Sequence, residues 1–187
     1  MTHDLQGQRV GILAADGVER IELEQPRGAL HGAGASTEVI SIHPGEIQAR
    51  QWDLESAGTF PVDRVVADVA VDDYDALLMP GGAVNPDQLR MNADAVNFVR
   101  AFAGTGKPIA TICHGPWTLA EADVIRGVRM TSWPSIRTDL RRAGADVVDE
   151  EVVIDRQFTS SRSPMDLPAF CAAIVDQFTK ARHKQPT

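Results

Sequence analysis

The chain has 187 residues with 18 Lys and Arg against 26 Asp and Glu, which gives a formal net charge of −8. Hydrophobic residues make up 43% and charged residues 24%, the balance of a globular domain rather than a disordered segment. Binding to a nucleic-acid backbone requires a basic face, so this acidic chain is a poor candidate for it. The sequence has neither an apolar run long enough to span a membrane nor an apolar signal region at its start. We therefore expect a single domain over 1–187, with frayed ends at about 1–7 and 181–187, in the cytoplasm.

The chain contains two cysteines, Cys113 and Cys171. Two thiols in unrelated local patterns do not make a disulfide framework, so a reducing compartment is expected. Neither cysteine stands in a CxxC or Cys/His spacing that would hold a metal ion, and we expect neither a metal nor a cofactor. Side chains alone must then carry the chemistry of the chain.

Short apolar runs alternate along the chain with segments of helical period. The run RVGILAA at 9–15 predicts a buried strand, and a helical pattern follows at 19–34. Residues 45–72 contain short alternating pieces and turn residues, which predict a small antiparallel excursion. The other predicted strands lie at 36–42, 75–82, 108–113, 128–132, 145–149 and 151–161, and the other predicted helices at 92–107, 116–124, 134–144 and 164–182.

This alternation predicts an α/β fold in which a mostly parallel sheet is sandwiched between helices. In such sheets the functional site lies at the carboxyl ends of the strands. Three predicted strand ends carry residues of chemical interest, at 15–19, 80–82 and 113–115. We expect these three segments to be neighbours in space.

Cys113 ends an apolar run and precedes a helical pattern. A sharp strand-to-helix turn would expose its side chain, as in a nucleophile elbow, and Gly115 supplies the small residue that such a turn needs. The N-terminus of the following helix favours the thiolate form of a nearby cysteine. Free cysteines are also commonly buried and inert, so the residue pattern leaves both interpretations open.

Gly81 and Gly82 directly follow a predicted strand. Their backbone N–H groups can approach a ligand closely, so one of them and the N–H of His114 are candidate oxyanion donors. A Pro-Gly-Gly sequence after a strand is also common in ordinary turns.

Glu19 is the candidate carboxyl near Cys113, because a partly buried carboxyl stays protonated and can donate a hydrogen bond to sulfur. Its alternative role is to complement the dipole of the following helix. The side chain of His114 is expected to point away from its sequence neighbour. The only histidine further along the chain is His183, in the polar tail, so no ordinary in-chain triad is expected.

At these residues the sequence resembles the ThiJ/PfpI family, and within it the PfpI branch of intracellular protease-like stress proteins. The resemblance covers nearly the whole chain and rests on a specific combination of segments. They are VERIEL, LMPGG, NPDQLRMN, GKPIATICHGPWTLAEADVIRG, TSWPSIRTDLRRAGADVVDEEVVID and SSRSPMDLPAF.

The resemblance implies a flavodoxin-like fold, close to class I glutamine amidotransferases, with the site at a subunit interface. It implies that Cys113 is the elbow nucleophile, Glu19 the carboxyl that hydrogen-bonds it and His114 the family's histidine. The acid that orients His114 would be Asp87 of a neighbouring subunit; the alternative is an Asp at the start of a short helix. A homodimer or a higher homo-oligomer is therefore expected.

Three further residues stand near the site in this pattern. Arg162 is expected near the interface or the mouth of the pocket, or else in a surface ion pair. Trp117 and Trp133 are expected to line or pack the pocket.

Two functions fit the resemblance. One is a cysteine enzyme acting on electrophilic carbonyls, either as a glutathione-independent glyoxalase or protein deglycase or as a PfpI-like cysteine peptidase. Its substrates would be small carbonyl compounds, peptides or glycated proteins. The other is a non-enzymatic redox-sensing or chaperone-like stress protein in which Cys113 is oxidised, because an accessible thiolate is also what peroxide attacks first.

Overall fold

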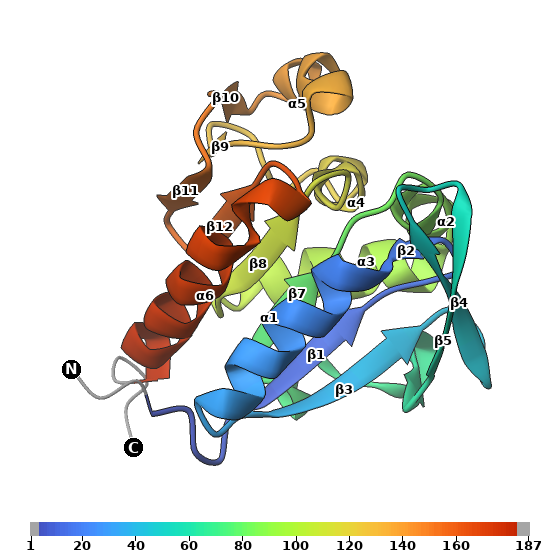
Figure 1. Ribbon diagram of the computed structural model, residues 1–187. Coiled ribbons are helices and arrows are strands. Elements are labelled where there is room, and N and C mark those ends of the chain that lie inside the picture. The colour runs from blue at the N-terminus through green and yellow to red at the C-terminus, as the bar shows by residue number, and fades with distance from the viewer. Residues whose placement is uncertain (1–3, 183–187) are drawn as a thin grey trace.

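The computed structural model describes residues 4–182 and contains a seven-stranded central sheet (Figure 1). The strand order is β11-β12-β8-β7-β1-β3-β6, and all neighbours pair in parallel except β11 and β12, which are antiparallel. The strands are β1 (Arg9–Leu13), β3 (Ser36–Ser41), β6 (Arg64–Val65), β7 (Ala76–Met79), β8 (Ile109–Ile112), β11 (Val152–Asp155) and β12 (Phe158–Ser161).

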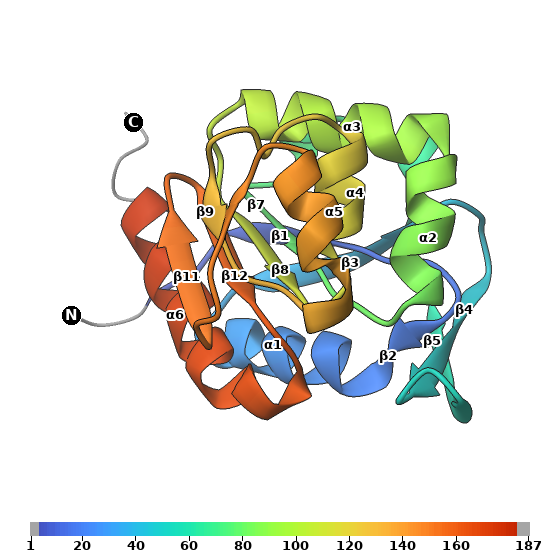
Figure 2. The same cartoon turned by 90° about the horizontal axis from the view of Figure 1, so that it is seen from above.

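Helices cover both faces of this sheet, as the view along its edge shows (Figure 2). The helices α1 (Arg20–Gly32) and α6 (Leu167–Arg182) pack on one face, around an apolar cluster that includes Leu23 and Phe170. The second cluster, on the other face, includes Phe98 and Phe102. The helices on that face are α2 (Val84–Met91), α3 (Ala93–Gly104), α4 (Pro116–Glu121) and α5 (Arg137–Arg142).

A separate three-stranded sheet stands beside the first, formed by β2 (Val18–Glu19), β4 (Glu46–Gln51) and β5 (Glu55–Pro61). The antiparallel pair of β4 and β5 is the excursion that the turn-rich segment predicts. Its tight turn contains Trp52 and Asp53, both with left-handed φ values, 51° and 62°. The remaining strands, β9 (Arg129–Met130) and β10 (Asp146–Val147), pair with each other.

The predicted α/β fold with a mostly parallel sheet is confirmed. Of the predicted frayed ends, residues 1–3 and 183–187, including His183, lie outside the described residues. Fraying is wrong for the adjoining segments: Leu5 is fully buried and its N–H donates to the carbonyl of Ala33, and α6 runs on to Arg182. No helix within residues 4–182 is long and apolar enough to cross a membrane.

Candidate active site

Cys113 lies at the abrupt turn between β8 and α4, at the carboxyl end of the sheet. Its φ is +62°, a left-handed conformation that costs a residue with a Cβ about 1 kcal/mol or more. Gly115 makes the turn possible, because a Cβ there would lie 2.6 Å from the carbonyl oxygen of Met79. The backbone is therefore strained at the residue that carries the thiol.

The thiol faces a small cavity of about 140 Å³. Cys113 is 6% exposed, so the cavity admits small groups rather than a folded chain. The three strand ends that the sequence analysis singles out do meet here. The cavity is lined by Glu19, Glu22, Trp52, Asp53, Gly82, Cys113, His114, Trp133 and Pro164.

The carboxyl against the sulfur is that of Glu22, so the assignment of this contact to Glu19 is corrected. Glu22 lies in the first turn of α1, is 0% exposed and shares a side-chain hydrogen bond with Cys113. Its Oε2 accepts a hydrogen bond of 2.9 Å from the N–H of Gly81. Its other oxygen, Oε1, is buried without a partner of its own in the part of the chain that the structure describes.

Glu19, three residues earlier, has a different task. Its carboxyl accepts hydrogen bonds from the N–H groups of Trp52 and Asp53, at the strained turn between β4 and β5. Asp53 in turn accepts a 2.6 Å hydrogen bond from the N–H of Ala83. Through these hydrogen bonds Glu19 stabilises the hairpin turn beside the cavity, and it does not contact the thiol.

The two glycines after β7 also divide their roles. The N–H of Gly82 and the N–H of His114 are the backbone groups that donate to the Cys113 sulfur. The N–H of Gly81 is occupied by Glu22, so among the predicted oxyanion donors Gly82 and His114 are the pair that lies at the Cys113 sulfur. A Cβ at Gly81 would lie 2.6 Å from the Cβ of Cys113 and 2.5 Å from the Glu22 carboxyl, so only glycine fits.

Burial raises the pKa values of both Glu22 and Cys113. It raises the pKa of Glu22 from 4.5 to about 8, aided by the negative charge of Glu19. Burial also raises the pKa of Cys113, and so does the negative charge of Glu22, while the Gly82 and His114 N–H groups lower it. The lowered thiol pKa expected at a helix N-terminus is thus wrong for this environment, because burial outweighs the two N–H groups. Each group's ionisation opposes the other's, so the pair titrates as one unit.

His114 points toward Cys113, contrary to the expectation that it points away. Its Nδ1 lies 3.3 Å from the Cys113 Sγ, and its Nε2 lies 3.3 Å from the hydroxyl of Ser135. Burial lowers the pKa of His114, while the negative charge of Asp53 acts in the opposite direction. The imidazole is therefore mostly neutral at neutral pH.

Both predicted tryptophans pack on the His114 ring. The Trp133 ring is stacked at 5.9 Å between centroids, and the Trp117 ring is tilted at 5.3 Å. Trp133 also lines the cavity, whereas Trp117 is held from outside by a 3.0 Å hydrogen bond from its Nε1 to Asp139. The structure therefore places Trp133 in the wall of the cavity and Trp117 against the His114 ring.

Two other predicted site residues lie away from the thiol. Arg162 forms ion pairs with Asp149 and Asp166, which is the surface ion pair named as its alternative, and it lines a different hollow, near Arg137. Asp87 is exposed on α2, where its predicted pairing with His114 of a second subunit stays a prediction.

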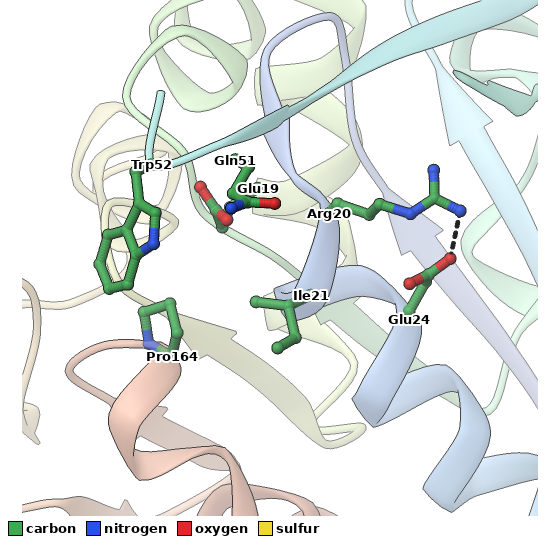
Figure 3. A pocket seen from close by; sticks show the side chains of 7 residues that line it. All are labelled: Glu19, Arg20, Ile21, Glu24, Gln51, Trp52 and Pro164. Atoms are coloured by element: carbon green, nitrogen blue, oxygen red, sulfur yellow. Dashed lines mark hydrogen bonds and ion pairs between the residues drawn. The ribbon is translucent and has the colours of Figure 1, made fainter. Parts of the chain in front are cut away.

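A wider groove of about 350 Å³ adjoins the cavity and shares Glu19, Trp52 and Pro164 with it. Figure 3 shows Trp52 and Pro164 on one side of this groove and Arg20 with its ion-paired partner Glu24 on the other. Trp52 is 54% exposed, so a large apolar surface stands at the entrance to the cavity.

Sequence reasoning missed Glu22, Trp52, Asp53 and Ser135. Glu22 did leave a signal: with Pro26 and Leu30 it forms a stripe at spacings of four on the buried side of α1. An acidic residue in a buried helical stripe is rare unless it is paired or functional. Trp52 and Asp53 come from a turn and Ser135 from a three-residue 3-10 helix, and these short segments carry no comparable signal.

The fold and the cluster of cysteine, histidine and buried glutamate at the ends of parallel strands define a cysteine-centred α/β domain. Residues 8–177 match the model of the DJ-1/PfpI family, and the chain belongs to this family. It is 41% identical over 167 residues to a deglycase of Pyrococcus abyssi, covering 89% of this chain and 97% of the relative. It is 40% identical over 166 residues to general stress protein 18 of Bacillus subtilis, covering 88% and 94%.

A comparison with solved structures supports the same family. A two-domain protein of Anabaena variabilis that contains DJ-1/ThiJ/PfpI-like and ferritin-like domains matches with a TM-score of 0.83 and 33% identity. The match covers 91% of this chain and 49% of the two-domain chain.

Proposed function

We propose that this chain is a stress-response enzyme of the deglycase or glyoxalase type, in which Cys113 attacks α-oxoaldehydes and their adducts on proteins. The observation that carries the proposal is the buried pair of Cys113 and Glu22, a thiol against a carboxyl whose pKa is raised to about 8. A carboxyl that exchanges protons near neutral pH suits proton transfer to and from carbon. The deglycase among the relatives supports the same chemistry.

The first step is addition of the Cys113 sulfur to the aldehyde carbon. The thiol proton passes to Nδ1 of His114, 3.3 Å away, and from there to the aldehyde oxygen, which becomes a hydroxyl. The product is a hemithioacetal in which the ketone carbon is still intact. The N–H groups of Gly82 and His114, which donate to the Cys113 sulfur, are the candidate donors that stabilise the developing oxyanion.

The second step uses Glu22 in its carboxylate form, which is the minor form at neutral pH and arises when the carboxyl releases its proton to solvent. It removes the proton from the carbon bonded to sulfur and returns it to the neighbouring ketone carbon, while the hydroxyl proton on the first carbon moves to the ketone oxygen. The first carbon is oxidised to a thioester and the second reduced to an alcohol, so no external oxidant or reductant is needed. Water then hydrolyses the thioester, releases a 2-hydroxy acid and restores the thiol.

The state of His114 favours this chemistry over peptide hydrolysis. Amide cleavage needs a positioned acid that protonates the leaving nitrogen, which in a cysteine peptidase is the imidazolium of the histidine. Burial lowers the pKa of His114, and within the described residues its Nε2 faces a hydroxyl instead of a carboxylate. The cavity of about 140 Å³ also accommodates a two- or three-carbon carbonyl more readily than a peptide segment.

The direct test measures conversion of methylglyoxal to lactate and cleavage of casein by the wild type, Cys113→Ala and Cys171→Ala. We expect lactate formation by the wild type and by Cys171→Ala, the matched thiol control, and loss of at least about 100-fold in Cys113→Ala. Casein cleavage without aldehyde turnover would favour the peptidase. Absence of both, with oxidation of Cys113 by peroxide, would favour the redox sensor.

We also propose that the chain acts as a homodimer in the cytoplasm, with the site close to the interface. Two exposed apolar residues of α2, Val84 and Met91, flank Asp87 and support assembly through this helix. Sedimentation at micromolar concentration tests it. A species of about twice the 20.2 kDa chain mass is expected, and the monomer mass alone would contradict assembly.

A further inference from the structure

The imidazole of His114 has one polar neighbour at each nitrogen. Nδ1 faces the Cys113 sulfur and Nε2 faces the Ser135 hydroxyl, both at 3.3 Å. Ser135 belongs to the short helix η3 (Pro134–Ile136), 21 residues further along the same chain. The two contacts use the two different ring nitrogens, so a chain of polar contacts runs from Ser135 through His114 to Cys113.

The tryptophans fix the plane of the His114 imidazole but still allow the ring to flip by half a turn within that plane's packing. Packing of Trp117 and Trp133 on the imidazole restricts tilting. Stacking contacts do not distinguish nitrogen from carbon, so a ring flipped about its long axis would pack equally well. The Ser135 hydroxyl does distinguish the two orientations, because only one of them offers it a nitrogen.

Ser135 is tied to the cysteine turn by the backbone. The N–H of Trp133 donates a 3.0 Å hydrogen bond to the carbonyl of Cys113, and the N–H of Ile136 donates to the carbonyl of Trp133. Ile136 is fully buried and anchors η3 in the core. The position of Ser135 relative to His114 is therefore set by the same segment that holds the strained turn at Cys113.

Charged groups surround His114 without reaching its Nε2. Glu19, Glu22 and Asp53 line the cavity together with Cys113 and His114. The Trp117 ring that packs on His114 donates from its Nε1 to Asp139, and Arg90 lies 5.4 Å from the centre of that ring. Among residues 4–182, the Ser135 hydroxyl is the group recorded at Nε2.

We propose that Ser135 is the positioning residue for His114, supplied by the same chain, and that it takes the place expected for an acid from a neighbouring subunit. A hydroxyl both donates and accepts, so it can pair with Nε2 whether that nitrogen is protonated or not. It orients the ring throughout the proton transfers of the reaction. Unlike a carboxylate, it brings no charge that would stabilise the imidazolium.

The measurement of turnover rests on the proposed function, so the experiment includes a second, independent measurement. Three variants are compared: Ser135→Ala removes the hydroxyl, Ser135→Thr keeps it, and Ser135→Asp supplies a carboxylate. Ser135 lies at an exposed position, which favours folding of all three. Turnover of methylglyoxal gives kcat and KM. Alkylation of Cys113 by iodoacetamide against pH, in a Cys171→Ala background, reports the thiol without catalysis.

We expect Ser135→Ala to lower kcat about tenfold with KM within about twofold, because the hydroxyl touches the imidazole and not the substrate. Ser135→Thr should restore kcat to within about threefold of the wild type. In Ser135→Asp the new carboxylate stabilises the imidazolium beside the thiol. Alkylation should then begin about one pH unit lower than in the wild type.

A Ser135→Ala enzyme with unchanged kcat and an unchanged alkylation profile would overturn the inference, as would a larger loss of kcat in Asp87→Asn than in Ser135→Ala. An effect that appears in thermal unfolding but not in kcat or in the pH profile would show a merely structural role and would also contradict it. If the wild type turns over no aldehyde, the proposed function fails. The alkylation profiles of Ser135→Ala and Ser135→Asp still decide the role of Ser135.

Discussion

The small cavity at Cys113 (the inner cavity) and the wider groove that adjoins it (the outer groove) each contain a glutamate of α1, buried in the first and exposed in the second. Glu22 in the inner cavity is fully buried, and its pKa is raised to about 8. Glu24 in the outer groove, two residues further along the same helix, is exposed and ion-paired with Arg20. The difference lies in the helix face: one side points at the sheet and the other at solvent. Burial, more than residue type or sequence position, selects which carboxyl can exchange protons near neutral pH.

Removing the acid of Glu22 should produce the largest effect. Glu22→Gln keeps the shape and still accepts a hydrogen bond from Gly81, but it cannot move a proton between carbons. We expect a loss of at least about 100-fold in kcat for methylglyoxal. Glu24→Gln is the matched control on the same helix and should lie within about twofold of the wild type. Equal activity of Glu22→Gln and the wild type would contradict the proton-transfer role.

The same variant should change the pH dependence of stability. The pKa of Glu22 is about 8 in the folded chain against an ordinary 4.5, so between these values the folded state keeps a proton that the unfolded chain has lost. The free energy of unfolding therefore falls as pH rises through this window. The free energy of unfolding of Glu22→Gln, measured relative to the wild type, should therefore rise by roughly 3 to 5 kcal/mol as the pH increases from about 4.5 to about 9. Urea unfolding at several pH values measures this gain, and a difference independent of pH would refute it.

Glu19 should stabilise the hairpin turn between β4 and β5 and have little effect on the thiol of Cys113. Glu19→Ala leaves the N–H groups of Trp52 and Asp53 without their acceptor, which should cost about 1–3 kcal/mol of stability. Because both residues line the cavity, kcat/KM should fall several-fold, while the alkylation profile of Cys113 should move little. Thermal unfolding and alkylation rates check this. A thiol pKa shifted as far as in Glu22→Gln would restore Glu19 as the partner of the sulfur.

The smallest effect is expected at the exposed ion pair of the outer groove. Arg20 also donates to the carbonyl of Ala57 and lies over the Phe60 ring, so it stays anchored without Glu24. Glu24→Gln should therefore lower the free energy of unfolding by about 0.5 kcal/mol or less, and this loss should vanish at high salt. Chemical unfolding at low and high salt measures it; a loss above about 2 kcal/mol would show that the groove wall depends on this pair.

The fold could be predicted because periodicity reports burial directly. The apolar runs at β1, β7 and β8 and the intervening helical stripes determine a parallel sheet with helices on both faces. The convergence of strand ends then follows from the topology and places Cys113 among the glycines and carboxyls. The two-residue strand β2 and the exact tightness of the hairpin turn depend on tertiary hydrogen bonds, so they leave little local signal.

The details of the site escaped prediction for a geometric reason. In extended backbone, neighbouring side chains point to opposite sides, which is why His114 was expected to face away from Cys113. The left-handed conformation of Cys113 breaks this alternation and lets both side chains approach within 3.3 Å. The choice between Glu19 and Glu22 likewise depends on where α1 begins: Glu19 precedes the helix as its N-cap, and Glu22 lies inside on the buried stripe.

The central claim is that the carboxyl of Glu22 is protonated beside the thiol at neutral pH. Infrared difference spectra between the wild type and Glu22→Gln, recorded across pH, detect the carbonyl band of the protonated carboxyl directly. The band should persist well above the ordinary pKa of 4.5 and disappear with a midpoint near 8, accompanied by a change in the S–H band of Cys113. Loss of the carboxyl band by about pH 5, with the S–H band unaffected by the substitution, would contradict the account.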